Sequence, residues 1–172
     1  MAVLKILEYP NERLAMESEP VTIFDDDLRA QIEDLFETLY ETSGIGMSAP
    51  QADILRRIVI MDHSEDRSAP EIYINPEVVA KAMPGFIEET CLSLPGVKAN
   101  VIRSTQVLVR AQDEQGDAFE RELQGMPAVC IQHEIDHLDG KLFIDRIGFI
   151  QRFRARKALR RLTEAAAERS AA

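Results

Sequence analysis

The feature that most constrains this chain is the pattern His-Glu-x-x-His at residues 133–137, which lies between Pro127 and Gly140. Proline suits the first position of a helix and glycine suits its C-terminal stop, so the segment is predicted to be helical. Residues four apart on a helix lie on one face, about one turn from each other. Both histidines can therefore bind one metal ion, with the glutamate beside a water on that ion. The alternative is an ordinary helix with two incidental histidines, because short patterns recur by accident.

Length and composition place limits on the kind of protein. At 172 residues the chain is expected to form one domain over residues 1–172, with residues 148–172 as a basic C-terminal helix whose end is frayed. No apolar run approaches the roughly 18 residues needed to span a bilayer, and the first residues do not look like a cleavable leader. We therefore expect a cytoplasmic protein without a membrane partner. Its two cysteines, Cys91 and Cys130, are expected to be thiols or metal ligands rather than a disulfide.

The charge of the chain is uneven. The net charge is −10, but residues 146–172 hold eight Lys/Arg against two Asp/Glu, a net +6, which leaves −16 for residues 1–145. An acidic body of this kind disfavours DNA binding, while the basic tail could still touch a phosphate-rich partner.

The order of the patterns indicates an α+β fold. An acidic start at Asp25-Asp26-Asp27 is followed by apolar residues at helical spacing, and this helix is expected to end near Gly44. Between residues 56 and 124 the chain reads as strands and turns, including separate strand segments around 72–74 and 86–92. We expect antiparallel strands packed around the central metal-binding helix, with an N-terminal helix before them and a C-terminal helix after.

The stretch Gly44-Ile45-Gly46-Met47-Ser48-Ala49-Pro50-Gln51 reads as a loop whose backbone approaches something closely. It is not a phosphate-binding loop, since no Lys-Ser/Thr follows and no strand precedes the glycines. An ordinary tight turn is the alternative.

A metal site on the helix needs a third ligand, because two imidazoles alone hold a divalent ion weakly. Cys130 shares the helical face with both histidines, but it lies about 10 Å along the axis from His137 at roughly 1.5 Å per residue. It would stand a full turn from the ion and reads better as a buried apolar thiol. Cys91 lies in a separate strand-like segment and can approach from across the site, although alone it would read as a core cysteine. A set of Cys91, His133 and His137 leaves a fourth position open for water.

Three stretches together carry a resemblance: residues 44–51, Glu89-Thr90-Cys91-Leu92-Ser93, and Gln132-His133-Glu134-Ile135-Asp136-His137. In order and spacing they resemble the three motifs of the peptide deformylases, from the N-terminus to about residue 150. The resemblance implies a metal-dependent hydrolase that removes the formyl group from the N-terminal formyl-methionine of newly made polypeptides and releases formate. It also implies ferrous iron (Fe2+) as the native metal of bacterial members, with Zn2+, Ni2+ or Co2+ as substitutes.

The resemblance assigns roles to individual residues. It implies that the metal ligands are Cys91, His133 and His137. It implies that Glu134 is the acid/base, and that the Gln51 amide and the Leu92 backbone N–H hold the oxyanion.

Further positions follow from the same resemblance. Gly46 would let the first motif lie close to the substrate. Asp136 would support the site from behind, paired with Arg103. The residues implied for the methionine pocket are Ile45, Ile87, Val129 and Cys130.

The chain departs from the family pattern at two places. Thr90 stands where the family usually has glycine, and Met47-Ser48 stands where Leu-Ala is more common. A β-branched side chain at position 90 would narrow the groove for the substrate's main chain. The first alternative is therefore a deformylase-like protein with altered specificity or no activity, which acts as a binding module. The second is a peptidase built on the same helix.

The partners implied are N-formylmethionyl nascent peptides and, through the basic helix around residues 152–161, the ribosome. Some bacterial family members dock such a helix on ribosomal RNA, and the charge pattern suits that use. The alternative is a solvated helix that faces the acidic body of its own chain.

Overall fold

The computed structural model describes residues 2–170 and, among them, the side chains of all but residues 163 and 165–170. The α-helices of this part are α1 (Asp26–Tyr40), α2 (Met126–Leu138) and α3 (Phe149–Ser170). The short 3₁₀ helices are η1 (Glu12–Ala15), η2 (Ala49–Ala52) and η3 (Phe143–Asp145). The strands are β1 (Gly46–Ser48), β2 (Ile58–Met61), β3 (Glu71–Glu89), β4 (Ala99–Gln112) and β5 (Ala118–Gln124). The predicted α+β class is confirmed. The helix α3 is described as far as Ser170, and residues 171–172 of the end that was expected to fray lie outside the described residues.

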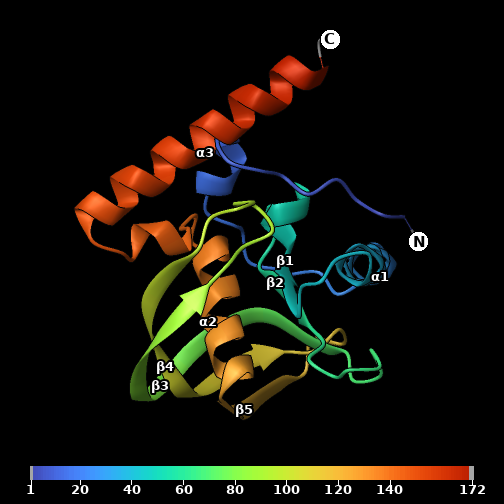
Figure 1. The fold of residues 1–172 in the computed structure, drawn as a ribbon. Helices are drawn as coiled ribbons and strands as arrows, with labels where there is room; N and C mark the ends of the chain where they lie inside the picture. Colours follow the sequence, from blue (N-terminus) through green and yellow to red (C-terminus); the bar gives the residue numbers. More distant parts are fainter. Residues whose placement is uncertain (1, 171–172) are drawn as a thin grey trace.

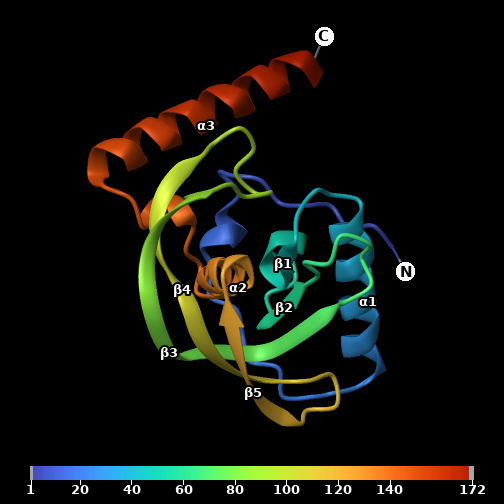
Figure 2. The ribbon, with the colours of Figure 1, turned by 60° about the horizontal axis from the view of Figure 1, so that its bottom comes forward.

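The strands form one antiparallel sheet in the order β1-β2-β3-β4-β5, and this sheet curls around α2 (Figures 1 and 2). The longest strand, β3, pairs with β2 at its start, where Ile58 faces Ile74, and with β4 up to Glu89 facing Ala99. A sheet curled in this way encloses a helix on its concave side, as Figure 2 shows for α2. The predicted central helix is confirmed.

Two expectations about the strands were wrong. The segments around 72–74 and 86–92 are not separate, because β3 runs without interruption from Glu71 to Glu89. Asn75 and Met83, each followed by proline, adopt positive φ and bend the strand, while its pairing with β4 shifts register and continues. The first motif is also not a loop throughout, since Gly46–Ser48 forms the edge strand β1 against β2.

The helix α1 covers the β1–β2 side of the sheet. Its N-cap Asp25 accepts a hydrogen bond from the Leu28 backbone N–H at 3.0 Å, as the acidic start predicted. The helix ends at Tyr40, four residues before the expected stop. Its buried face packs on Met47, Ile58, Ile60 and Ile74 and consists of Leu28, Ile32, Leu35 and Leu39.

The helix α2 is buried on nearly all sides, including its polar residues. Its apolar face packs on β2 and β4 through Ala128, Ile131 and Leu138. After its end Gly140 turns with φ of +66°, and a Cβ there would stand 2.6 Å from the Ala15 carbonyl oxygen. This close approach explains the stop that the sequence predicted.

The C-terminal helix α3 lies across the end of the molecule (Figure 1) and shares a third core with the body. Its buried Leu159 belongs to the same cluster as Leu14, Leu94 and Phe143. Within residues 2–170, none of the helices has both the length and the apolar character that crossing a bilayer would require.

Candidate metal centre and catalytic cavity

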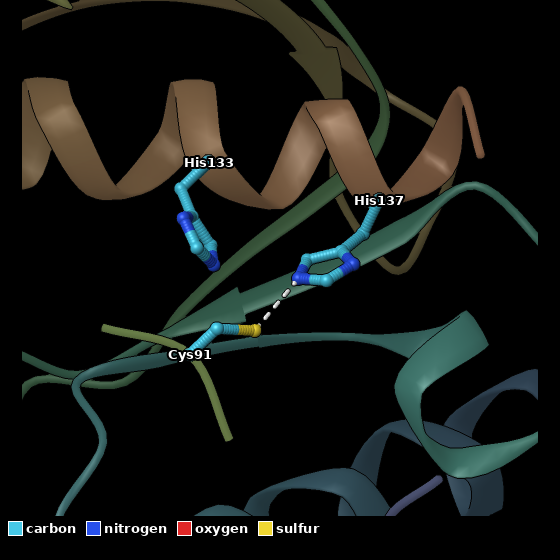
Figure 3. A group of neighbouring side chains, drawn as sticks. All are labelled: Cys91, His133 and His137. Atoms are coloured by element: carbon cyan, nitrogen blue, oxygen red, sulfur yellow. Dashed lines mark hydrogen bonds between the residues drawn. The ribbon is translucent and has the colours of Figure 1, made fainter. Parts of the chain in front are cut away.

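Three side chains converge to form a metal site. His133 and His137 point from α2 toward Cys91, which follows the end of β3 (Figure 3). Cys91 Sγ lies 3.2 Å from His137 Nε2, and the ligand atoms of all three residues lie within 4.8 Å of one another. Ligands of a tetrahedral ion, with bonds of about 2.0–2.3 Å, stand about 3.5 Å apart. The donor set therefore fits a divalent ion, and the third ligand comes from the segment that follows β3 rather than from α2.

The neighbours of His133 determine which ring nitrogen faces the ion. Its Nδ1 lies 2.8 Å from Glu89 Oε2, which leaves Nε2 free to bind metal. The buried Phe143 ring stacks on the His133 ring with centroids 6.1 Å apart. Burial lowers the pKa of His133, but the Cys91 sulfur and the Glu89 carboxylate raise it more. His133 is thus the more tightly supported of the two histidines.

His137 is a buried imidazole. Its Nδ1 finds no hydrogen-bond partner among the described residues, and its Nε2 faces Cys91. Burial lowers the pKa of His137 well below its usual value, which favours the neutral ring that a metal requires.

Glu134 supplies a carboxylate oxygen that the described residues leave unpaired. Its side chain lines the cavity beside the metal ligands, and its Oε2 is buried without a partner in residues 2–170. Burial raises the pKa of this carboxyl above its usual value. A carboxyl in this environment can take up a proton and pass it on.

The Gln51 amide is fixed in one orientation. Its Oε1 accepts from the Ser48 backbone N–H at 2.9 Å and from the Ser48 hydroxyl at 3.0 Å. The amide nitrogen is thereby turned toward Cys91 Sγ at 3.7 Å and Ser93 Oγ at 3.4 Å. Within the described chain no hydrogen bond occupies the backbone N–H of Leu92. The Gln51 amide nitrogen therefore lies beside a metal ligand, and Leu92 lines the same cavity.

A cavity of about 380 Å³ opens over this centre. Of the residues predicted for the site, those that line it are Ile45, Gly46, Gln51, Cys91, Leu92, Val129, Cys130, His133 and Glu134. Ile87 does not line it, although it lies two residues before Glu89 on the same strand. Thr90 is exposed on the cavity wall beside Cys91, and Met126 is half exposed at α2's first position.

The sequence of residues 3–153 matches the family described as polypeptide deformylase. The chain belongs to this family. It is 47% identical over 161 residues to the peptide deformylase of Chromobacterium violaceum, covering 94% of this chain and 96% of that one. It is 48% identical over 161 residues to the peptide deformylase of Pseudomonas aeruginosa, covering 92% and 95%. A peptide deformylase structure from Legionella pneumophila superimposes with a TM-score of 0.91 at 39% identity, covering 96% of this chain and 98% of that one.

The deformylase resemblance seen in the three motifs is thus confirmed. Sequence reasoning overlooked three residues of this deformylase site: Glu89, which holds His133; Phe143, which stacks on it; and Ser48, which orients Gln51. A signal existed for Glu89. Arg103 lies at an inward position of the strand that alternates from Val101, and a buried arginine there requires a buried carboxylate.

Proposed function

We propose that Glu134, Gln51 and Leu92 carry out the deformylation that the family performs, over a metal held by Cys91, His133 and His137. The chain is a peptide deformylase, a metal-dependent hydrolase that removes the formyl group from the N-terminal methionine of nascent peptides. The assignment of these roles rests on the convergence of the Gln51 and Glu134 side chains on one cavity. The Gln51 amide nitrogen lies 3.7 Å from Cys91 Sγ, and Glu134, whose Oε2 has no partner among the described residues, lines the same cavity from α2.

The chemistry follows from these positions. Cys91, His133 and His137 would hold a divalent ion, which would supply a water of lowered pKa and polarise the formyl oxygen. Glu134 accepts a proton from the attacking water and delivers it to the amine nitrogen as the C–N bond breaks. The Gln51 amide and the Leu92 N–H donate to the formyl oxygen as it gains negative charge. Formate and a free N-terminus leave.

The shape of the cavity supports selection of the substrate. Ile45, Val129 and Cys130 give it an apolar part suited to the methionine side chain, and Gly46 keeps the wall close. Ile87 is left out of this pocket because it does not line the cavity. Thr90 stands exposed on the wall, so we assign it an influence on the residues that follow methionine rather than on the formyl group.

Ferrous iron is our proposal for the native metal, on the strength of the family resemblance. The sulfur and two nitrogen donors equally suit zinc, nickel or cobalt as substitutes. We also propose that residues 1–172 act as one domain in the cytoplasm, where formylated nascent peptides are made. The shared core of α3 and the body supports a single domain.

Docking on the ribosome is part of the same proposal. The outward side of α3 carries exposed basic residues, namely Arg154, Lys157, Arg160 and Arg161. Two other arginines of the helix, Arg152 and Arg156, instead pair with Asp145 of the body at 2.6 and 3.1 Å. The helix therefore uses one side to neutralise its own body and leaves the other free for a phosphate-rich partner.

The decisive experiment measures formate released from a formyl-methionyl dipeptide by iron- or nickel-loaded protein under anaerobic conditions. The wild-type chain should release formate, and it should leave an acetyl-methionyl dipeptide and an unblocked peptide intact. Glu134→Gln should lower kcat by roughly 10²–10⁴-fold, because it removes the proton carrier and keeps the shape. Metal content, measured by elemental analysis, should be unchanged.

A matched control is Glu120→Gln on the exposed strand β5, which should leave kcat within about two-fold. Metal-loaded, folded wild-type protein that releases no formate would refute the proposed function. Normal turnover by Glu134→Gln would refute the mechanism alone, and cleavage of the unblocked peptide would favour the peptidase alternative.

A further inference from the structure

Behind the metal centre, a row of charged side chains leads away from His133. Glu89 holds His133 Nδ1, and the Arg103 guanidinium donates to both oxygens of Glu89 at 2.6 and 3.1 Å. The same guanidinium donates through Nη1 to Asp136 Oδ2 at 2.7 Å. Arg146 then donates through Nε and Nη2 to the two oxygens of Asp136. The row therefore runs from the metal ligand to Arg146 without a gap.

Because most of this row is buried, its charge balance depends on its last member, Arg146. The side chains of Glu89, Arg103 and Asp136 are at most 5% exposed, whereas Arg146 is 41% exposed. Two carboxylates and two guanidinium groups balance in charge. Without Arg146, both buried carboxylates would depend on Arg103 alone, and a buried charge that loses its partner costs several kcal/mol. Arg103 would then be drawn from Glu89 toward Asp136.

A second cavity, of about 620 Å³, lies on this side of α2 and is distinct from the catalytic one. Its lining includes Arg103, Asp136 and Arg146. Of these three side chains Arg146 is the most exposed, and it covers both carboxylate oxygens of Asp136. A shorter side chain at position 146 would let water compete for both oxygens.

The backbone places Arg146 where it can act on His133. Arg146 directly follows the short helix η3, and its backbone N–H donates to the Phe143 carbonyl at 3.0 Å. Phe143 is the residue whose ring stacks on His133. Residues 143–146 thus act on His133 in two ways. The Phe143 ring packs directly on the face of its ring, and Arg146 reaches its Nδ1 indirectly.

We propose that Arg146 is a positioning residue for the metal ligand His133, acting through Asp136, Arg103 and Glu89. The inference rests on the metal site of the proposed function and adds a residue to it. Arg146 touches neither the ion nor the substrate; it keeps Glu89 aimed at His133 Nδ1, and so keeps Nε2 aimed at the ion.

The test is the affinity of metal-free protein for Co2+, read from the absorption of the cysteine–cobalt bond. Arg146→Met should weaken cobalt binding about ten-fold, because partners behind a metal ligand typically contribute 10–100-fold and this one acts through three others. Arg146→Lys keeps the charge but offers one nitrogen to two oxygens, so it should recover part of the loss.

The matched control is Arg57→Met. Arg57 lines the same cavity and pairs with Asp139 at the end of α2 at 3.0 Å, but among the described residues no hydrogen bond connects this pair to His133. This variant should bind cobalt within about two-fold of wild type, a change too small to reflect a lost partner of the ligand. The control also separates geometry from charge. Removing a positive charge would by itself strengthen the binding of a cation. If only Arg146→Met binds cobalt more weakly, the loss therefore reflects the positioning of His133 and not the change in charge.

The result that would overturn the inference is Arg146→Met binding cobalt as tightly as wild type, with the same spectrum. Equal weakening in Arg57→Met would overturn it as well, because the effect would then belong to the cavity as a whole. If Arg146→Met fails to fold, the cobalt affinity of Arg146→Lys becomes the test. Full wild-type affinity in that variant would mean that only the positive charge is needed, and it would overturn the role proposed for the two hydrogen bonds from Arg146 to Asp136. A wild-type chain that binds no cobalt would overturn the proposed function together with this inference. A wild-type chain that releases formate, with Arg146 variants that bind cobalt as tightly as wild type, would overturn this inference alone.

Discussion

At the scale of single residues, Gly46 is held to glycine by a contact rather than by its backbone angles. A Cβ at this position would stand 2.5 Å from Cys130 Sγ and 3.4 Å from Glu134 Oε1. Real side chains never approach so closely, and the Cys130 sulfur is itself buried in the core between α2 and the sheet. The absent side chain lets strand β1 lie directly against the helix that bears the metal ligands.

Gly46→Ala should therefore lower the free energy of unfolding by about 1–3 kcal/mol, the usual cost of overfilling a packed core. Chemical denaturation measures this loss, and the double variant Gly46→Ala/Cys130→Ala should recover most of it because the sulfur is gone. Gly85→Ala serves as the control, since its Cβ would meet no atom nearer than 3.6 Å. Wild-type stability of Gly46→Ala would show that the contact relaxes freely.

The site residues that follow from local spacing alone are those carried by one helix. His133, Glu134 and His137 follow from the period of α2 alone, and the rise per residue excluded Cys130 as ligand. Glu89 and Phe143 were overlooked because they lie outside α2: Glu89 reaches His133 from a strand 44 residues earlier, and Phe143 reaches it from a 3₁₀ turn beyond the end of the helix. No local period records such a contact.

At the scale of elements, the cavity wall before β1 is secured by the loop that follows β2. Arg67 donates to the carbonyl oxygens of Gly44 and Thr42 at 2.9 and 3.3 Å. Its guanidinium lies over the Tyr40 ring, 5.5 Å from the centroid, and the Tyr40 hydroxyl donates to Asp62 at 2.9 Å. The end of α1, the wall and the residue after β2 are thus joined by two side chains, Arg67 and Tyr40.

Arg67→Met should loosen this wall and raise KM for the formyl peptide about five-fold, because a lost hydrogen bond is worth roughly 1 kcal/mol. The change in kcat should be smaller, since the metal ligands and Glu134 are untouched. Steady-state kinetics separates the two constants, and Arg110→Met, which loses only the exposed pair with Glu120, is the control. A fall in kcat with unchanged KM would contradict the assignment of Arg67 to the wall.

The elements predicted well from sequence are the two with strong periodicity and clear ends, α1 and α2. The strand β3 was divided because Asn75-Pro76 and Met83-Pro84 look like turns, whereas the ladder to β4 carries the chain through both bends. The edge strand β1 was overlooked because the glycines at 44 and 46 argue against a strand, and only packing against β2 and α2 overrides that preference.

At the scale of the whole molecule, charge is divided between an acidic body and the basic outward side of α3. Because Leu159 packs into the body, removal of the entire helix would expose Leu14 and Phe143 and confuse docking with unfolding. The sharper variant keeps Leu159 and replaces the exposed basic residues with glutamine: Arg154, Lys157, Arg160 and Arg161.

This variant should lose co-sedimentation with ribosomes and should show a shallower dependence of binding on salt, because fewer phosphate contacts release fewer counterions. Its formate release from a dipeptide should remain normal, since the helix lies away from the cavity. The control neutralises four exposed basic residues of the body: Lys5, Lys81, Arg110 and Lys141. Equal sedimentation of both variants and wild type would mean that α3 faces only its own body.

The single long strand β3 has a consequence for how such a chain can diverge. Its start is fixed by pairing with β2, and its end presents Glu89 to His133. Because side chains alternate between the faces of a strand, inserting or deleting one residue between these points would turn Glu89 away from the helix. Residues 80–84 in between are exposed and free to vary in kind. We therefore expect this stretch to tolerate substitutions far better than insertions or deletions.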